Sequence, residues 1–259
     1  IYGRHGEAPL PVVAAKSPAD CFDAAIEAAR IALKYRTPVI LLSDGYIANG
    51  SEPWKLPDIS TYEKITVPFA TETNGTDSEG RDVFHPYLRD PETLARPWAI
   101  PGTPGLMHRV GGLEKQDVTG NVNYTPENHA LMGDLRADKV AGVARDYEPT
   151  QIMGDEDADV CIVGWGSTWA AIDSAVQRCR RNDQKVAWVH IRNVFPLPND
   201  LGDILRRYER VIVPELNRGQ LCNMLRANYL VDAQPLSKVA GLPFSAREIQ
   251  HIVTEGGQS

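Results

Sequence analysis

The sequence predicts an α/β fold in which helices cover both faces of an open parallel sheet. Residues 160–163 form a continuous apolar run, followed by a glycine-rich turn and an amphipathic helix pattern that extends to Arg181. Further apolar runs at 186–191 and 211–213 are each followed by another helix pattern. This alternation is typical of parallel sheets, because a crossover segment must connect strands that run in the same direction.

The composition is that of an ordinary globular protein, and it argues against several classes of partner. The 259 residues, 42% hydrophobic and 24% charged, suffice for one large or two smaller α/β domains. A net charge of −7 argues against nucleic acid and anionic membranes as partners. No apolar run approaches the roughly 20 residues of a membrane span. The start at Ile1 lacks an initiator Met and a signal-peptide pattern, so we expect a fragment or the ordered part of a longer chain.

The cysteines are dispersed and form no C-x-x-C pair. They are Cys21, Cys161, Cys179 and Cys222. Cys161 and Cys179 fall on apolar faces, where buried thiols behave as small hydrophobic side chains. We therefore expect no metal site and no Fe–S cluster held by this chain alone, and a reducing, cytoplasmic location.

Residues 1–49 predict the end of a domain whose beginning is missing. Ser17 and Pro18 favour a helix start, and the helix pattern runs to about Tyr35. A buried strand is expected at 38–42 and a turn at 43–46. The expected apolar stripe of the helix consists of Phe22, Ile26, Ala29 and Leu33. One helix and one strand cannot cover a sheet by themselves.

Residues 50–125 predict a packed linker. Prolines, glycines and threonines recur there, and periodic segments are missing. Structureless stretches longer than about 15 residues are unusual inside a compact domain. The segment nevertheless carries large apolar side chains, namely Trp54, Phe69, Phe84, Tyr87, Trp98 and Met107. A free linker would not carry them, so we expect them to pack on a neighbouring domain or subunit.

Residues 126–259 predict a second α/β domain. Thr125 and Pro126 favour a helix start, and the strands described above follow. Further helices are expected from Asn199 and at about 221–225, and Ser245 is expected to cap a last short helix. The apolar face expected for the first helix consists of Leu131, Met132, Leu135, Val140 and Val143.

A dinucleotide site at the turn after residue 163 is disfavoured. Gly164 and Gly166 have the right spacing, and Ser167 or Thr168 can cap the following helix. Trp169, however, stands where a third glycine would let the helix approach the strand. No acidic residue ends a strand about 20 residues later. A tight strand-to-helix turn is favoured instead.

A diphosphate–metal motif at Asp44 is disfavoured as well. Asp44 and Gly45 are preceded by Ser43 where such a motif has a glycine, and Asn49 comes too early in the chain. Mg²⁺ requires several oxygen ligands in a tight octahedron, which this run does not offer. A turn at a strand end is favoured.

Two further features leave their role open. Residues 214–220 follow a predicted strand at its carboxyl end, where α/β sheets bind ligands, and Glu215 and Asn217 fit an interface as well as a plain turn. Four histidines are dispersed without ligand spacing, so structural or surface roles are the default; they are His85, His108, His129 and His190.

Residues 4–7, Arg-His-Gly-Glu, are the short run richest in chemically active groups. Arginine can grip a carboxylate with two parallel hydrogen bonds, and histidine can transfer protons near neutral pH. We therefore take Arg4 and His5 as candidate catalytic residues. On the residues alone, a solvated loop near the terminus remains the alternative.

Several short motifs lie along nearly the whole chain, at residues 2–9, 17–22, 36–46, 48–54, 213–217, 219–221 and 238–244. In these motifs the chain resembles the α subunits of 2-oxoacid:ferredoxin oxidoreductases, most closely the 2-oxoglutarate branch. The resemblance implies the C-terminal portion of the subunit. It also implies the end of a pyrimidine-type thiamine diphosphate domain, followed by a transketolase C-terminal-like domain.

The resemblance further implies an enzyme that decarboxylates a 2-oxoacid with thiamine diphosphate, reduces ferredoxin and releases an acyl-CoA from coenzyme A. Mg²⁺ and a [4Fe–4S] cluster are expected in a β subunit, and the enzyme is expected to be active only with it. The expected partners are that β subunit, a second αβ copy in a heterotetramer, ferredoxin and the upstream half of the α subunit. The pyrimidine-activating glutamate belongs upstream, so Glu7 is not assigned that role.

Three alternatives remain open at this point. The chain could be a non-catalytic scaffolding piece of such a complex. It could belong to a family member that acts on pyruvate or a branched-chain 2-oxoacid. An independent nucleotide-binding domain is the third, and Trp169 argues against it.

Overall fold

The computed structural model describes residues 1–2 and 4–254, except for the side chain of Arg4. Within them the chain divides into two compact units. Of the described residues, 1–2, 4–11, 27–39 and 56–145 form the first unit, and 12–26, 40–55 and 146–254 form the second. None of the described helices is both long and apolar enough to cross a membrane.

The second unit contains a five-stranded sheet in the order β10-β9-β6-β7-β5. Its strands are β6 (Val160–Trp165), β7 (Ala187–Ile191), β9 (Arg210–Glu215), β10 (Ala233–Ser237) and β5 (Met153–Gly154). The pairs β6–β7, β6–β9 and β9–β10 are parallel, which confirms the predicted parallel sheet. Two strands were missed by the sequence analysis: β10, and the short antiparallel edge strand β5.

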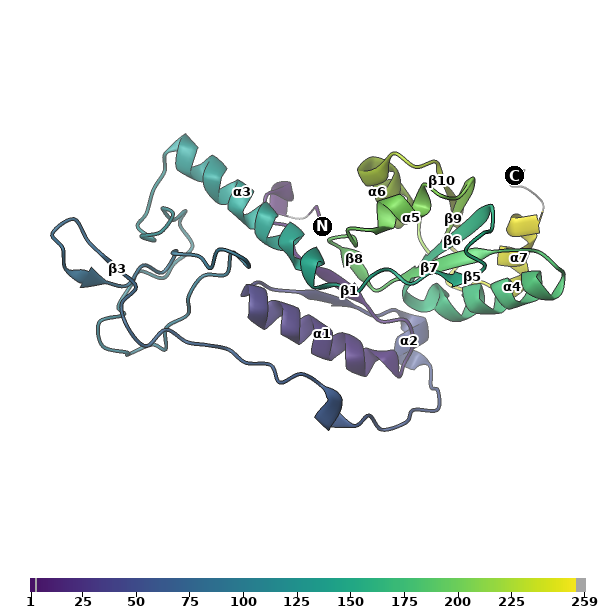
Figure 1. Cartoon of the computed structure of the whole chain (residues 1–259), viewed down its shortest axis with the longest axis horizontal. Coiled ribbons are helices and arrows are strands. Elements are labelled where there is room, and N and C mark those ends of the chain that lie inside the picture. The colour runs from purple at the N-terminus through teal and green to yellow at the C-terminus, as the bar shows by residue number, and fades with distance from the viewer. Residues whose placement is uncertain (3, 255–259) are drawn as a thin grey trace. The chain divides into compact units, whose positions relative to one another are not determined.

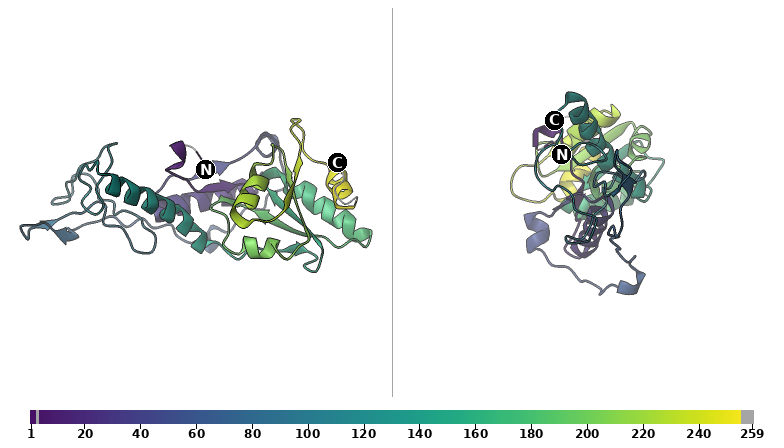
Figure 2. Two further views of the ribbon diagram at one scale, coloured as in Figure 1. Left: turned by 90° about the horizontal axis from the view of Figure 1, so that it is seen from above. Right: turned by 90° about the vertical axis from the view of Figure 1, so that its left-hand side faces the viewer.

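Helices cover both faces of this sheet, as predicted (Figures 1 and 2). Side chains alternate along β6, so that Cys161 and Val163 pack against α5 and α6, whereas Ile162 packs against α4 and α7. The bounds are α4 (Trp169–Arg181), α5 (Leu201–Leu205), α6 (Gln220–Tyr229) and α7 (Ala246–Thr254). Ser245 caps α7, because its hydroxyl accepts from Glu248 N at 3.3 Å while Glu248 accepts from Ser245 N at 2.7 Å.

A three-stranded sheet in the same unit has the order β2-β1-β8. β1 (Val12–Ala14) is parallel to β2 (Ile40–Leu42) and antiparallel to β8 (Asn193–Phe195), which the sequence analysis missed. The strand expected at 38–42 is present as β2, but its expected burial was wrong, since Ile40 is 42% and Leu41 40% exposed. β2 is an edge strand, and the described residues leave the side chains of Ile40 and Leu41 partly exposed.

Helix α1 (Asp20–Tyr35) differs from the prediction at its start and in its buried face. It begins after Ser17 and Pro18, because those residues form a turn in which Ser17 Oγ accepts from Asp20 N at 3.3 Å. The buried stripe is offset from the predicted one and consists of Ala24, Ala28, Ile31 and Tyr35. Two small alanines on that face permit close packing. The following helix α2 (Gly45–Asn49) begins at its cap, Asp44.

The first unit is built around α3 (Pro126–Gly142), which begins at the predicted cap Thr125. Of its predicted apolar face, Met132, Val140 and Val143 are buried, whereas Leu131 is 45% exposed. The remaining elements are the short strands β3 (Gly75–Thr76) and β4 (Asp82–Val83) and the single turns η1 (Arg4–Gly6), η2 (Ile59–Thr61), η3 (Val143–Asp146) and, in the second unit, η4 (Gly166–Thr168).

The aromatic side chains of residues 50–125 are only partly covered. Phe84 is buried, whereas Trp54 is 47% and Phe69 45% exposed. Trp54 contacts Phe22 with 5.5 Å between ring centroids. Packing of the exposed rings on another domain or subunit stays a prediction.

Candidate functional site

The carboxyl ends of β6 and β9 are joined by a buried carboxylate. Glu215, at the end of β9, has no exposed surface. Its Oε1 accepts from Trp165 Nε1 at 3.2 Å and from Leu221 N at 2.9 Å, and its Oε2 accepts from Cys222 N at 3.0 Å. The amides of Leu221 and Cys222 belong to the first turn of α6, where unpaired N–H groups favour an anion. Glu215 therefore fixes two strand ends to one helix, a role that the sequence analysis left open.

A cavity of about 290 Å³ lies at these strand ends. Asn217 is part of its wall, and its Oδ1 accepts from Gln220 N at 2.9 Å in the turn that precedes α6. The full lining is Ala14, Ala15, Leu42, Ser43, Asp44, Ile47, Trp165, Gly166, Ser167, Thr168, Leu216, Asn217 and Gln220. Such a position is where α/β sheets commonly bind ligands.

Asp44 lies in the wall of this cavity and is engaged by hydrogen bonds. Its Oδ1 accepts from Ile47 N at 2.9 Å, which caps α2, and its Oδ2 accepts from the Ser167 hydroxyl. Asn49 donates to Gly45 O at 2.8 Å. Asp44 is therefore the N-cap of the short helix α2 at the strand end, and the plain turn favoured from the sequence was wrong because residues 45–49 are helical. The described residues contain no group of three or more side chains that could hold a metal ion.

Trp169 packs in an aromatic cluster at the start of α4. Its ring centroid lies 4.7 Å from that of Trp188 and 4.9 Å from that of His190, and Lys16 Nζ lies 3.9 Å above it. Burial, together with the charges of Lys16 and Arg192, lowers the pKa of His190 to about 3. Neither ring nitrogen of His190 has a hydrogen-bond partner among the described residues. A neutral, packed imidazole fits the structural role expected for this histidine.

In the turn after β6, neither Ser167 nor Thr168 caps the following helix with its side chain, although the sequence predicts one of them to do so. Thr168 precedes α4, but its hydroxyl bonds to the backbone of Trp165 and caps no helical amide. Ser167 donates to Asp44 instead. Gly166 has φ of 56°, a left-handed conformation that favours glycine.

The Arg-His-Gly-Glu run at residues 4–7 lies in the first unit. It forms the turn η1, in which His5 is exposed and has φ of 61°. The side chain of Arg4 lies outside the described part of the chain. Glu7 is held to α3, because its carbonyl oxygen accepts from Arg136 Nε at 3.4 Å and its carboxylate lies 3.9 Å from His129 Nε2. His5 has no hydrogen-bond partner among the described residues.

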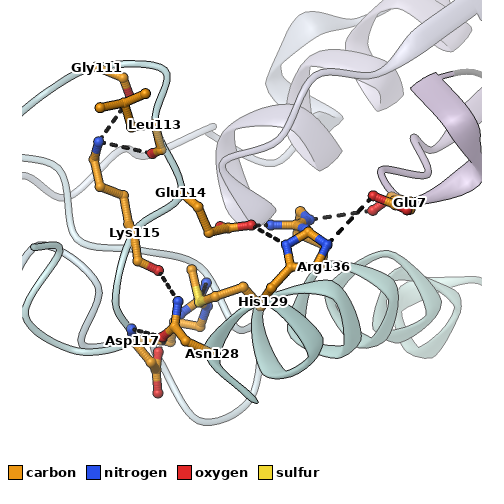
Figure 3. A network of polar contacts seen from close by, with 11 residues as sticks. Glu7, Gly111, Leu113, Glu114, Lys115, Asp117, Asn128, His129 and Arg136 are labelled. Atoms are coloured by element: carbon orange, nitrogen blue, oxygen red, sulfur yellow. Dashed lines mark hydrogen bonds and ion pairs between the residues drawn. The ribbon is translucent and has the colours of Figure 1, made fainter. Parts of the chain in front are cut away.

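A polar network extends from Glu7 across α3 (Figure 3). Glu114 accepts from His129 Nδ1 at 2.9 Å and from Arg136 Nη1 at 3.4 Å. These two contacts outweigh partial burial and lower the pKa of Glu114. Asn128 then donates to Lys115 O at 2.9 Å. The network fixes the Glu7 end of the candidate loop, and the histidine spacing in the sequence did not reveal it.

Domain families match both parts of the chain. The thiamine-diphosphate-binding domain of pyruvate flavodoxin/ferredoxin oxidoreductases matches residues 2–123. Core domain II of pyruvate:ferredoxin oxidoreductases matches residues 158–252.

Whole-chain comparisons agree with these matches. The chain is 50% identical over 254 residues to the 2-oxoglutarate oxidoreductase subunit KorA of Mycobacterium tuberculosis, covering 98% of this chain and 37% of the relative. It is 28% identical to subunit alpha of 2-oxoacid:ferredoxin oxidoreductase 2 of Aeropyrum pernix, again over 98% of this chain and 39% of the relative.

A solved structure has the same fold over nearly the whole chain. It is the 2-oxoglutarate:ferredoxin oxidoreductase of Magnetococcus marinus with 2-oxoglutarate, coenzyme A and succinyl-CoA bound. The TM-score is 0.85 at 32% identity, and the match covers 98% of this chain and 43% of that one. The chain thus spans 37–43% of the length of the M. tuberculosis, A. pernix and M. marinus proteins.

Proposed function

We propose that this chain, which belongs to the family of 2-oxoacid:ferredoxin oxidoreductase α subunits, is part of a subunit that takes part in the oxidative decarboxylation of 2-oxoglutarate. The reaction yields an acyl-CoA and reduced ferredoxin. The substrate is supported by the likeness to the 2-oxoglutarate oxidoreductase subunit of M. tuberculosis and to the 2-oxoglutarate:ferredoxin oxidoreductase of M. marinus.

The cofactor fits this chain only in part. The match to a thiamine-diphosphate-binding domain supports a share of the cofactor site. The diphosphate and its Mg²⁺ do not fit at Asp44, because both oxygens of that carboxylate already accept protein hydrogen bonds. We therefore place the Mg²⁺–diphosphate site and the [4Fe–4S] cluster in a β subunit, with coenzyme A as co-substrate.

The proposed assembly follows from this division of the site. Residues 1–49 end a pyrimidine-type domain, 50–125 form a packed linker, and 126–259 form the transketolase C-terminal-like domain. The partners are the β subunit, the upstream half of the α subunit, a second αβ copy and ferredoxin. The exposed faces of Ile40, Leu41 and Trp54 support partners that cover them. The free thiols support a cytoplasmic location.

Within this assembly, Arg4 binds the distal carboxylate of 2-oxoglutarate, and His5 donates a hydrogen bond to the same group or assists proton transfer. The observation that carries this role is the attachment of Glu7 to Arg136, which holds one end of the loop while His5 remains exposed. An arginine fork matches a carboxylate better than a lysine does.

The test is Arg4→Ala in the full assembled enzyme. We expect kcat/KM for 2-oxoglutarate to fall by about two orders of magnitude or more, because the substrate charge is left unpaired. Turnover of 2-oxobutyrate, which lacks the distal carboxylate, should change little. Arg109→Ala, an exposed arginine of the same unit, is the matched control.

Each other outcome has its own meaning. Equal loss on both substrates would assign Arg4 to folding or cofactor positioning. No loss on either would return residues 4–7 to a solvated loop. It would also favour the non-catalytic scaffolding alternative for this segment.

A further inference from the structure

The first unit contains a strongly cationic cavity of about 370 Å³. The basic residues in its wall are Arg36, Arg89, Arg96, Lys115, Arg136 and Lys139. Among the described residues that line it, Glu114 is the one acid. A larger cavity of about 640 Å³ in the same unit differs, because Glu63, Asp90 and Glu92 offset its cations.

Two of the basic side chains have carboxylate partners. Arg89 Nη1 donates to Asp117 Oδ1 at 2.7 Å, and Arg136 shares Glu114 with His129. These pairs neutralise charge within the wall and need no ligand.

Two more bind only backbone carbonyls. Lys115 Nζ donates to Gly111 O at 3.2 Å and to Leu113 O at 3.0 Å, as Figure 3 shows. Arg36 donates to Pro68 O at 2.6 Å and to Arg96 O. Carbonyl oxygens satisfy the donors of these two side chains, and the charge of Asp90 also acts on Arg36.

Arg96 and Lys139 have no hydrogen-bonding or ion-pair partner for their charged groups among the described residues. The Arg96 guanidinium lies 4.3 Å from the centroid of the Tyr87 ring, and that of Arg89 lies 5.5 Å from the same centroid. Arg89 Nε is buried, and the described part of the chain offers it no hydrogen-bond partner. An unpaired N–H donor of Arg89 and the uncompensated charge of Arg96 therefore both lie close to the Tyr87 ring.

The environment of Lys139 disfavours the charged form of its side chain. Burial, and then the charges of Arg89 and Arg96, lower the pKa of Lys139 to about 8. An anion in the cavity would relieve this repulsion.

We propose that this cavity binds the phosphate group of a small molecule, with Arg96 and Lys139 as its principal charged contacts. Arginine forks suit phosphate geometry, lysine supplies a compact point charge, and the volume lies within the range of small-ligand sites. Two uncompensated cations match a dianion better than a single carboxylate. The proposal does not depend on the function proposed above.

The probe is inorganic pyrophosphate, titrated calorimetrically into the assembled enzyme at constant ionic strength. We expect Arg96→Gln and Lys139→Gln each to weaken binding by about tenfold or more, as is typical for a lost charge-assisted hydrogen bond. Lys139→Arg should recover most of the affinity. Arg178→Gln, an exposed cation on α4, should leave it unchanged.

The same titration is repeated with inorganic phosphate. Tighter binding of pyrophosphate would indicate the phosphates of a larger molecule, and equal binding would indicate free phosphate. Wild-type affinity in both Gln variants, or no saturable binding at all, would overturn the proposal. A structure of the complex with an acidic side chain seated between Arg96 and Lys139 would also overturn it.

Discussion

The indole nitrogen of Trp165 donates a hydrogen bond of 3.2 Å to the buried carboxylate of Glu215, and this links the ends of two neighbouring parallel strands. The same carboxylate accepts from two amides of α6. The sheet and the helix that covers it are thus connected through one side chain.

Glu215→Ala should lower the free energy of unfolding by at least about 2 kcal/mol, because it leaves buried donors unsatisfied. Trp165→Phe removes one neutral donor and should cost about 1 kcal/mol. Urea titrations measure both, with the exposed Glu209→Ala as the control. A loss for Glu215→Ala no larger than for Glu209→Ala would contradict the clamping role.

The strands of the five-stranded sheet show where sequence reasoning succeeds. Strands β6, β7 and β9 are continuous apolar runs covered on both faces, so their hydrophobicity marks them. β10 was missed because Pro235 and the polar Gln234 and Ser237 argue against a central strand. It lies at an edge, where a proline is tolerated.

Long-range packing explains the remaining errors. Alanine-rich α1 offers more than one apolar stripe, and only tertiary contacts select the one with Ala24 and Ala28. The cationic cavity combines residues from Arg36 to Lys139, which no local motif connects. That Arg96 and Lys139 lack partners for their charges in the described part of the chain can be recognised only from the contacts in the folded structure.

Lys139 predicts a stability that rises with pH. Its folded pKa of about 8 lies below the ordinary value of 10.5, so between these values the unfolded state binds more protons. At neutral pH the buried charge costs at most about 3 kcal/mol. Lys139→Gln should therefore be more stable than wild type near pH 7, with the difference shrinking towards pH 10.5. Urea titrations in phosphate-free buffer measure it; a constant difference would contradict the shifted pKa.

The lowered pKa of Glu248 predicts a loss of stability at acidic pH. Hydrogen bonds from Lys238 and Ser245 lower its pKa to about 2. Its stabilisation is present above the ordinary pKa and is lost as the pH falls through about 2. Because the side chain is 43% exposed, the contribution should stay below about 1 kcal/mol. Melting curves of Glu248→Gln and wild type should differ at pH 7 and converge near pH 2.

The cysteines should differ in reactivity. Burial raises the pKa of Cys161 to about 12, and it also raises that of Cys179 and Cys222. Burial and neighbouring carboxylates also raise the pKa of Cys21, but Cys21 alone among the four is partly exposed. Iodoacetamide at about pH 8 should therefore label Cys21 first and the other three only after unfolding. Mass spectrometry of wild type and Cys21→Ser reports the order; early labelling of Cys161 would contradict it.

Two of the edge strands in the second unit, β10 and β2, differ in whether they can pair with a further strand. Pro235 lies in edge strand β10 and lacks the N–H that a further strand would need. Edge strand β2 carries Ile40 and Leu41 with their side chains uncovered. Of these two edges, we therefore expect β2, and not β10, to pair with a strand of another chain. Produced without its partners, the chain should therefore self-associate through β2, and co-expression should suppress the resulting insolubility.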